Sequence, residues 1–289
     1  MKNLLFALLA FLLVAACATQ PPHPEMPTYA AGYLAEGASV VGKISLTASP
    51  ELKKKLDEHA SLRDVVDRTR DLWFSFSLKG LKPAGWRLVL MGDFPKGLVG
   101  WALDGKPGWK KQNEPGPQWR DVKAGVSVAL PEDGVVLASA QSFEPNDLVW
   151  NARLARELPS AVLQKTDLFV DIQSPSGVLF GEAGSRLIPI QELRLALQAT
   201  SDGWEGPIVL ILPNEQAART TRFLLKIWAA SVASQAPPAQ GSLQAQLSQL
   251  VWTVRGSTLV ADHFVFKNST LLGLVDKLLE GKKSPKAEP

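Results

Sequence analysis

Alternating hydrophobic and polar positions recur at matching places in the two halves of this 289-residue chain. Apolar residues occupy every second position of 72–78 in the first half and of 193–199 in the second half. Alternation with a period of two is typical of strands with one buried face. Further strands are predicted at 39–46, 86–91, 168–172 and 208–212. The pattern therefore predicts strand pairs in both halves.

Each half also ends in the same way. A hairpin is predicted at 126–138 across Pro131–Gly134, and another at 251–266 across Gly256-Ser257. Helices are predicted to follow these hairpins, from Asn146 and from Asn268. The matching order predicts a tandem duplication of one α+β unit, spanning 34–161 and 162–281. We expect each unit to be a mostly antiparallel sheet with helices packed on one face, and the two sheets to meet face to face or edge to edge.

Other segments carry helix signals. Ser49 and Pro50 fit the cap and first position of a helix, and a second helix is predicted from Ser61 to Arg68. The strongest amphipathic pattern covers 216–234. Its apolar stripe consists of Phe223, Leu224, Ile227, Trp228 and Val232, and its basic residues are Arg219, Arg222 and Lys226. The pattern favours a helix that covers a core with the apolar stripe, and the alternative is a helix that binds a partner.

The N-terminus has the layout of a secretion signal. A positive start at Lys2 is followed by an apolar run from Leu4 to Val14, too short to span a membrane as a mature helix. The stretch Val14-Ala15-Ala16-Cys17 resembles the lipobox of bacterial lipoproteins. The resemblance implies that residues 1–16 are removed and that Cys17 carries acyl chains that anchor the chain in a membrane. Cys17 is the sole cysteine, so the chain has no disulfide framework.

Residues 17–33 are expected to be a tether, because prolines crowd positions 21–27. By the same resemblance, Ala18 after the lipidated cysteine favours the outer membrane over the inner membrane, within a cell-envelope location. At the other end, 282–289 is a basic segment with Lys282, Lys283 and Lys286, interpreted as a solvated tail that attracts anionic headgroups weakly at most.

Composition argues against several function classes. The 31 Lys and Arg residues, one of them in the signal, nearly balance 28 Asp and Glu residues, so no electrostatic footprint for nucleic acid is expected. The three histidines have no metal-ligand spacing, and no Gly-x-Ser-x-Gly motif occurs. Residues 100–106 have the spacing of a phosphate loop, but Pro107 removes the hydroxyl and the backbone donor, so no nucleotide is expected. We therefore predict no cofactor, no metal and no catalytic residue.

Tryptophan is the remaining signal, with nine tryptophans against two tyrosines. Residues 100–121 are rich in Gly and Pro and are predicted to form a long loop. This loop carries aromatic and basic candidates for a binding surface: Trp101, Trp109, Trp119, Lys110, Lys111 and Arg120. Indoles beside cations suit sugar rings, acidic glycans, lipid headgroups or a partner protein. The alternative is that these tryptophans only hold the loop against the sheet.

The sequence thus predicts a non-enzymatic, lipid-anchored binding or scaffold module of the cell envelope. Its partners are the membrane, through the N-terminal lipid, and an envelope protein or glycan. The alternative is an envelope hydrolase that acts on glycan or lipid with carboxylates such as Asp93 and Asp104. Two carboxylates about 5–9 Å apart in a cleft would favour that alternative.

Overall fold

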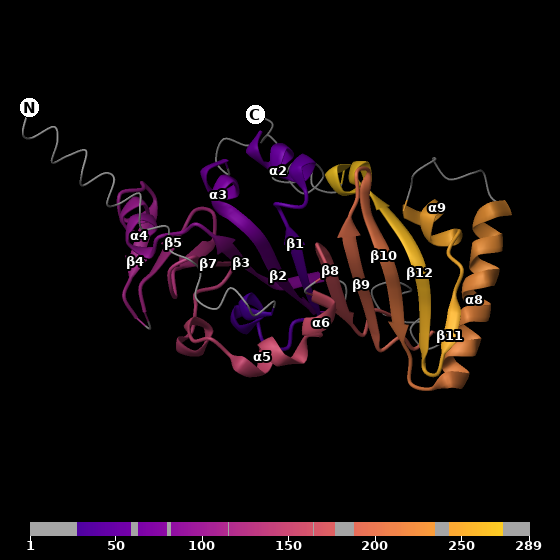
Figure 1. Ribbon diagram of the computed structural model, residues 1–289. Helices are drawn as coiled ribbons and strands as arrows, with labels where there is room; N and C mark the ends of the chain where they lie inside the picture. The colour runs from indigo at the N-terminus through magenta and orange to yellow at the C-terminus, as the bar shows by residue number, and fades with distance from the viewer. Residues whose placement is uncertain are drawn as a thin grey trace, which may run out of the picture.

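The computed structural model describes residues 28–58, 63–79, 82–114, 116–163, 165–176, 188–234 and 243–273. These residues form an α+β fold on one 12-stranded sheet, in which all neighbouring strands run antiparallel (Figure 1). The strands are β1 Val40–Ser45, β2 Thr69–Lys79, β3 Lys82–Gly92, β4 Trp109–Gln112, β5 Gln118–Asp121, β6 Val126–Ala129, β7 Val135–Ser139, β8 Leu168–Gln173, β9 Glu192–Ala199, β10 Gly203–Ile211, β11 Thr253–Arg255 and β12 Thr258–Lys267.

Helices are inserted between these strands. They are η1 Tyr29–Tyr33, α2 Pro50–Asp57, α3 Arg63–Arg68, α4 Lys96–Asp104, η2 Pro145–Leu148, α5 Ala152–Glu157, α6 Ser160–Leu163, α8 Glu215–Ser234 and α9 Leu243–Ser248. Figure 1 shows α4 and α8 at opposite ends of the sheet. No helix within the described ranges is long and apolar enough to cross a membrane.

The two halves of the chain meet in the middle of the sheet. Strands β1 and β8 pair antiparallel, with Val40 opposite Ile172 and Ile44 opposite Leu168. Outward from this pair, the order is β1-β2-β3-β7-β6-β5-β4 on one side and β8-β9-β10-β12-β11 on the other. The described strands thus form one continuous sheet, and within the described residues the β5–β4 pair beyond β6 has no counterpart beyond β11. The duplication itself, with its boundaries at 34–161 and 162–281, stays a prediction.

Side chains alternate between two faces of the sheet. Face A carries Trp73, Val89 and Phe169, which pack in one buried cluster with η1. Face B carries Leu90 and Val136 under α4 in the first half, and Leu210 and Leu259 under α8 and α9 in the second half. Helices α2 and α3 lie over the end of β1, around Leu46, Leu52 and Val66. The first half therefore has helices on both faces, and the described helices α8 and α9 of the second half cover face B.

The segment 100–121 is not the long loop that its Gly and Pro content predicted. It contains the second half of α4 and the strand pair β4–β5. Asp133 Oδ1 accepts a hydrogen bond of 2.7 Å from the backbone N–H of Lys96 at the start of α4. Gly100 packs against the ring of Trp119, and a Cβ at this glycine would lie in ordinary van der Waals contact with the indole, at 3.4 Å. The packing of α4 on the Trp119 ring outweighs the low helix propensity of glycine.

Candidate functional site

The six predicted binding residues do not share one surface. On β4 and β5, Lys111 lies opposite Trp119, and Lys110 lies opposite Arg120. Because side chains alternate along a strand, Trp109, Lys111 and Trp119 lie on face B beneath α4, whereas Lys110 and Arg120 lie on face A. Trp101 belongs to α4 itself. Cys17, the predicted lipidation site, lies outside the described residues.

Trp119 is part of the core. Its side chain is 4% exposed, and its indole N–H donates a 2.7 Å hydrogen bond to Asp104 Oδ1. Lys111 Nζ lies 3.1 Å from Asp104 Oδ2 and 5.3 Å from the centre of the Trp119 ring. The hydrogen bond from Trp119, and then that from Lys111, lower the pKa of Asp104 below its ordinary value. Trp119 therefore fastens α4 to the sheet and has no surface for a ligand.

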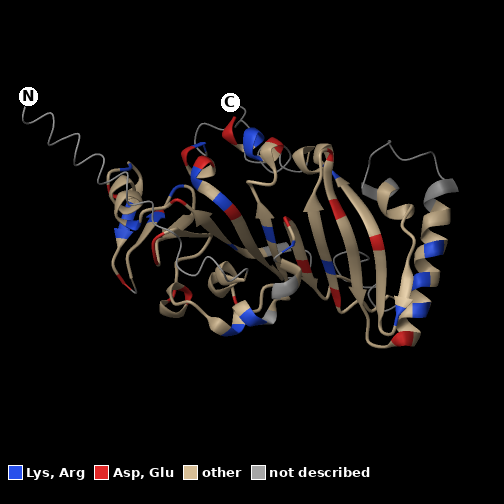
Figure 2. Cartoon of the chain, viewed as in Figure 1, with Lys and Arg blue, Asp and Glu red and all other residues tan. Residues whose placement is uncertain are grey.

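The outward side of α4 is apolar. Trp101 is 77% exposed and Leu98, three residues earlier on the same side of the helix, is 51% exposed. We call these two residues the α4 surface. Trp109 is half-buried nearby, with Lys106 Nζ 5.7 Å from its ring centre. Figure 2 shows Lys and Arg residues around β4. An exposed indole next to leucine, with cations close by, suits the apolar face of a sugar or a partner protein.

A second exposed apolar group lies on α8 and corrects the sequence interpretation of that helix. Phe223, Ile227 and Trp228, which were expected to face the core, are exposed. The helix instead packs through Ala218 and Leu225, with the fully buried Thr221 between them. The spacing of 218, 221 and 225 satisfies the same helical period as the larger stripe. Periodicity alone thus could not tell which of the two stripes faces the sheet.

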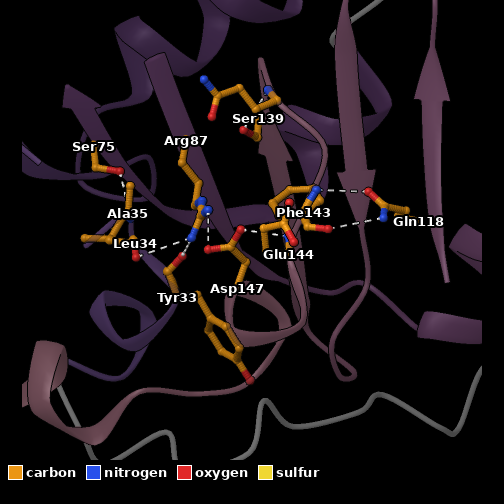
Figure 3. Close-up of polar contacts among 11 residues, drawn as sticks. Tyr33, Leu34, Ala35, Ser75, Arg87, Gln118, Ser139, Phe143, Glu144 and Asp147 are labelled. Atoms are coloured by element: carbon orange, nitrogen blue, oxygen red, sulfur yellow. Dashed lines mark hydrogen bonds and ion pairs between the residues drawn. The ribbon is translucent and has the colours of Figure 1, made fainter. Parts of the chain in front are cut away.

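A polar network on face A was not foreseen from the sequence (Figure 3). Arg87 of β3 is 9% exposed, and its Nη2 lies 2.7 Å from Asp147 Oδ1. Arg87 Nη1 also donates to the carbonyl oxygens of Tyr33 and Leu34, at 3.3 and 3.4 Å. The ring of Phe143 lies 5.5 Å from the guanidinium carbon. Arg87 thereby connects η1 and the 143–147 segment to the sheet.

Gln118 extends this network to β5. Its side-chain oxygen accepts from the N–H of Phe143 at 3.1 Å, and its Nε2 donates to the Phe143 carbonyl at 3.4 Å (Figure 3). At the other end, Ser75 Oγ accepts from the N–H of Ala35 at 3.2 Å. The partners come from distant segments, so no spacing in the sequence could indicate them.

Two phenols converge on one carboxylate beside this network. Tyr29 Oη and Tyr33 Oη donate to Glu132 Oε1 at 2.5 and 2.7 Å. Burial first, and then the hydrogen bond to Glu132, raise the pKa of Tyr29 to about 12 and raise the pKa of Tyr33 further. Both phenols therefore stay neutral donors, and Glu132 holds η1 against the β6–β7 turn.

The carboxylates considered for an enzyme have other partners. Asp93 Oδ2 lies 3.8 Å from Arg68 Nη1, and Asp104 binds Trp119 and Lys111. The structure brings together a different pair, Asp171 and Glu192.

Asp171 lies on β8 and is 7% exposed. Burial, and then the negative charge of Glu192, raise the pKa of Asp171 to about 6. Arg194 pairs with Glu192 and lies 3.8 Å from Asp171 Oδ2. Gln173 Nε2 donates to Asp171 Oδ1 at 3.0 Å. Within the described ranges, no three His, Cys, Asp or Glu side chains are grouped to hold a metal ion.

Comparisons with known proteins give the fold. The chain is similar to crystal structures of TP0453, with TM-scores of 0.60 for crystal form III and 0.56 for forms IV and I. Sequence identity is 15–16%, and the matches cover 84–86% of this chain and 95–97% of those chains. At this identity, the likeness shows a shared fold and carries no site residue across. No family model matches the chain. No curated protein matches it either.

Proposed function

We propose that the chain is a non-enzymatic binding module of the cell envelope, anchored to the outer membrane through a lipid on Cys17. In this proposal the α4 surface contacts a partner protein or a glycan. The observation that carries it is the exposure of Leu98 and Trp101 on a helix whose opposite side is packed firmly on Trp119. A rigid scaffold that holds an exposed indole is typical of recognition sites.

The energetics support the proposal. Exposed indole and leucine side chains leave apolar area in water, and contact with a partner removes that area at about 25 cal/mol per Å². The α4 surface contributes little to the packing of the fold, because the inward residues Val99 and Leu103 make the contacts with the sheet. Its apolar side chains are thus available to a partner without loss of core packing.

The test compares capture of envelope material by three lipidated full-length proteins: the wild type, the double variant Leu98→Ser/Trp101→Ser, and Val122→Ser. Val122 is a matched control, because it is 62% exposed at the same end of the sheet but lies outside α4. We expect a protein or glycan retained by the wild type and by Val122→Ser to be lost with the double variant. Equal capture by all three proteins contradicts the α4 surface as the binding site.

The hydrolase remains a second candidate, and its supporting observation is the Asp171–Glu192 pair. A carboxyl group with a pKa of about 6 beside a second carboxylate is a combination that acid–base catalysis uses. Asp171 is nearly buried, which favours the binding module over this candidate. Hydrolysis of labelled cell-wall glycan or phospholipid by the wild type, lost in Asp171→Asn and Glu192→Gln, would establish the enzyme.

A further inference from the structure

A row of polar side chains crosses face A at the β4 end of the sheet. In register, Lys110 lies opposite Arg120, Arg120 opposite Ser127, Ser127 opposite Ser139, and Ser139 opposite Arg87. Neighbours in such a row have Cβ atoms about 5 Å apart. The row therefore places three cations and two hydroxyls side by side, on the face opposite the α4 surface.

Among the described residues, the ion pair of this row lies at its Arg87 end. Asp147 pairs with Arg87, and both of its oxygens are in use, because Oδ2 accepts from the N–H of Glu144 at 2.9 Å. Lys110 and Arg120 have no ion pair with any carboxylate within the described ranges. Like charges directly opposite each other in a sheet are destabilising. The Lys110–Arg120 pair thus carries an excess of positive charge with no ion-pair partner in the described part of the chain.

A buried hydroxyl, that of Ser127, lies opposite Arg120 in the row and is a second sign of a binding site there. Ser127 is fully buried, and its Oγ has no hydrogen-bond partner in the part of the chain that the structure describes. Buried polar groups are almost always paired, so this hydroxyl still has its hydrogen-bonding capacity to offer to a ligand. Arg120 is already fixed in place, because its Nη1 donates to Ser142 Oγ at 2.5 Å. Its other N–H groups have no hydrogen-bond partner among the described residues and are available to a ligand alongside the Ser127 hydroxyl.

We propose that Lys110, Arg120 and Ser127 bind an oxyanion, the phosphate or carboxylate group of a ligand. The guanidinium offers a planar set of donors that matches both groups, and the lysine adds a mobile cation at the open side. Arg120 is half-buried and Lys110 is exposed on the edge strand β4, so the ligand enters from that edge. The site goes beyond the proposed function, since it lies on the other face from the α4 surface and does not depend on it.

The experiment is a calorimetric titration of the detergent-solubilised full chain with inorganic phosphate and, separately, with acetate, at constant ionic strength. The wild type is expected to bind at least one of them saturably. Arg120→Gln is expected to weaken this binding about tenfold or more, since charge-assisted hydrogen bonds are lost. Lys110→Gln is expected to weaken it less, and this exposed substitution leaves the contact between Arg120 and Ser142 intact. Saturation by phosphate alone, or by acetate alone, tells which group the site takes.

Two further variants separate the site from a general charge effect. Lys123→Gln removes the same charge from an exposed position in the turn after β5, and binding is expected to be unchanged. Ser127→Ala is expected to weaken binding while slightly stabilising the unliganded protein, because it removes an unpaired buried hydroxyl. Absence of saturable binding to both anions, or equal affinity of the wild type and Arg120→Gln, overturns the proposal. A loss of affinity in Lys123→Gln as large as that in Lys110→Gln overturns it as well.

Discussion

Arg87 Nη2 of β3 lies 2.7 Å from Oδ1 of Asp147, a residue of η2 that follows β7. The same guanidinium donates to the carbonyl oxygen of Tyr33, so the pair connects η1 and η2 to face A of the sheet. Residue 28, the first described position, immediately precedes η1. In the proposed lipoprotein, η1 is therefore the first described element after the membrane tether. The Arg87–Asp147 pair, together with the two phenols on Glu132, holds η1 to the sheet.

Asp147→Ala is expected to destabilise the protein by about 3 kcal/mol, because it leaves the buried guanidinium of Arg87 without its counter-charge. The exposed Arg153–Glu36 ion pair, which joins α5 to the segment after η1, offers a matched control. Glu36→Ala is expected to cost under about 1 kcal/mol, since exposed pairs contribute little. Urea denaturation measures both, and equal losses would show that Arg87 does not depend on Asp147.

Replacement of Trp119 and of Trp101, at the β4 end of the sheet, is expected to change the stability of the protein by different amounts. Trp119→Ala removes a buried indole and its hydrogen bond to Asp104, at a cost of about 3–5 kcal/mol. Trp101→Ala removes an exposed side chain and is expected to change stability by less than about 0.5 kcal/mol. Thermal unfolding of the two single variants checks this, and a large loss in Trp101→Ala would make the α4 surface part of the core.

Most of the fold was predictable because the period-two pattern follows one buried face per strand. The predicted strand 168–172 matches β8 at Leu168–Gln173, and the predicted strand 193–199 matches β9 at Glu192–Ala199. The helix predicted at 216–234 is α8, Glu215–Ser234. These elements carry their signal locally, in the spacing of their apolar residues.

The site was less predictable because its geometry comes from pairing across distant segments. Residues 100–121 were interpreted as a loop, since glycine and proline there outweigh a helical signal of only nine residues in α4. Trp119 and Arg120 point to opposite faces because they are neighbours in a strand, but the register with β6, which no local pattern encodes, decides which of them lies under α4. Asp171 and Glu192 meet only because β8 and β9 are adjacent in the sheet.

The Asp171–Glu192 pair predicts a pH-dependent stability. A carboxyl with a folded-state pKa near 6 and an ordinary unfolded pKa near 4 binds its proton more tightly in the folded protein. Its contribution to stability is thus highest at low pH and is lost as the pH rises from about 4 to about 6. Asp171→Asn has no carboxyl to titrate at this position. Its free energy of unfolding, relative to that of the wild type, is therefore expected to rise by about 1–2 kcal/mol from pH 4 to pH 7. Denaturation curves of both proteins across this range check it, and a constant difference contradicts the shifted pKa.

The last prediction concerns the anchor, on which the proposed location depends. Cys17→Ser replaces a thiol by a hydroxyl, which cannot form the thioether that the lipobox resemblance implies. The variant is expected to accumulate as a precursor that keeps residues 1–16 and takes up no labelled fatty acid. Ala18→Ser is the control, since it leaves the thiol in place and is expected to be labelled and processed normally.

Intact mass and fatty-acid labelling measure both outcomes in the same cells. The described elements all lie within residues 28–273, so the Cys17→Ser precursor is expected to keep the far-ultraviolet circular dichroism of the processed protein apart from the retained signal. A loss of label with the fold intact then assigns the defect to the anchor and not to misfolding. Labelled fatty acid in Cys17→Ser, or a mature N-terminus other than residue 17 in the wild type, contradicts the lipoprotein assignment.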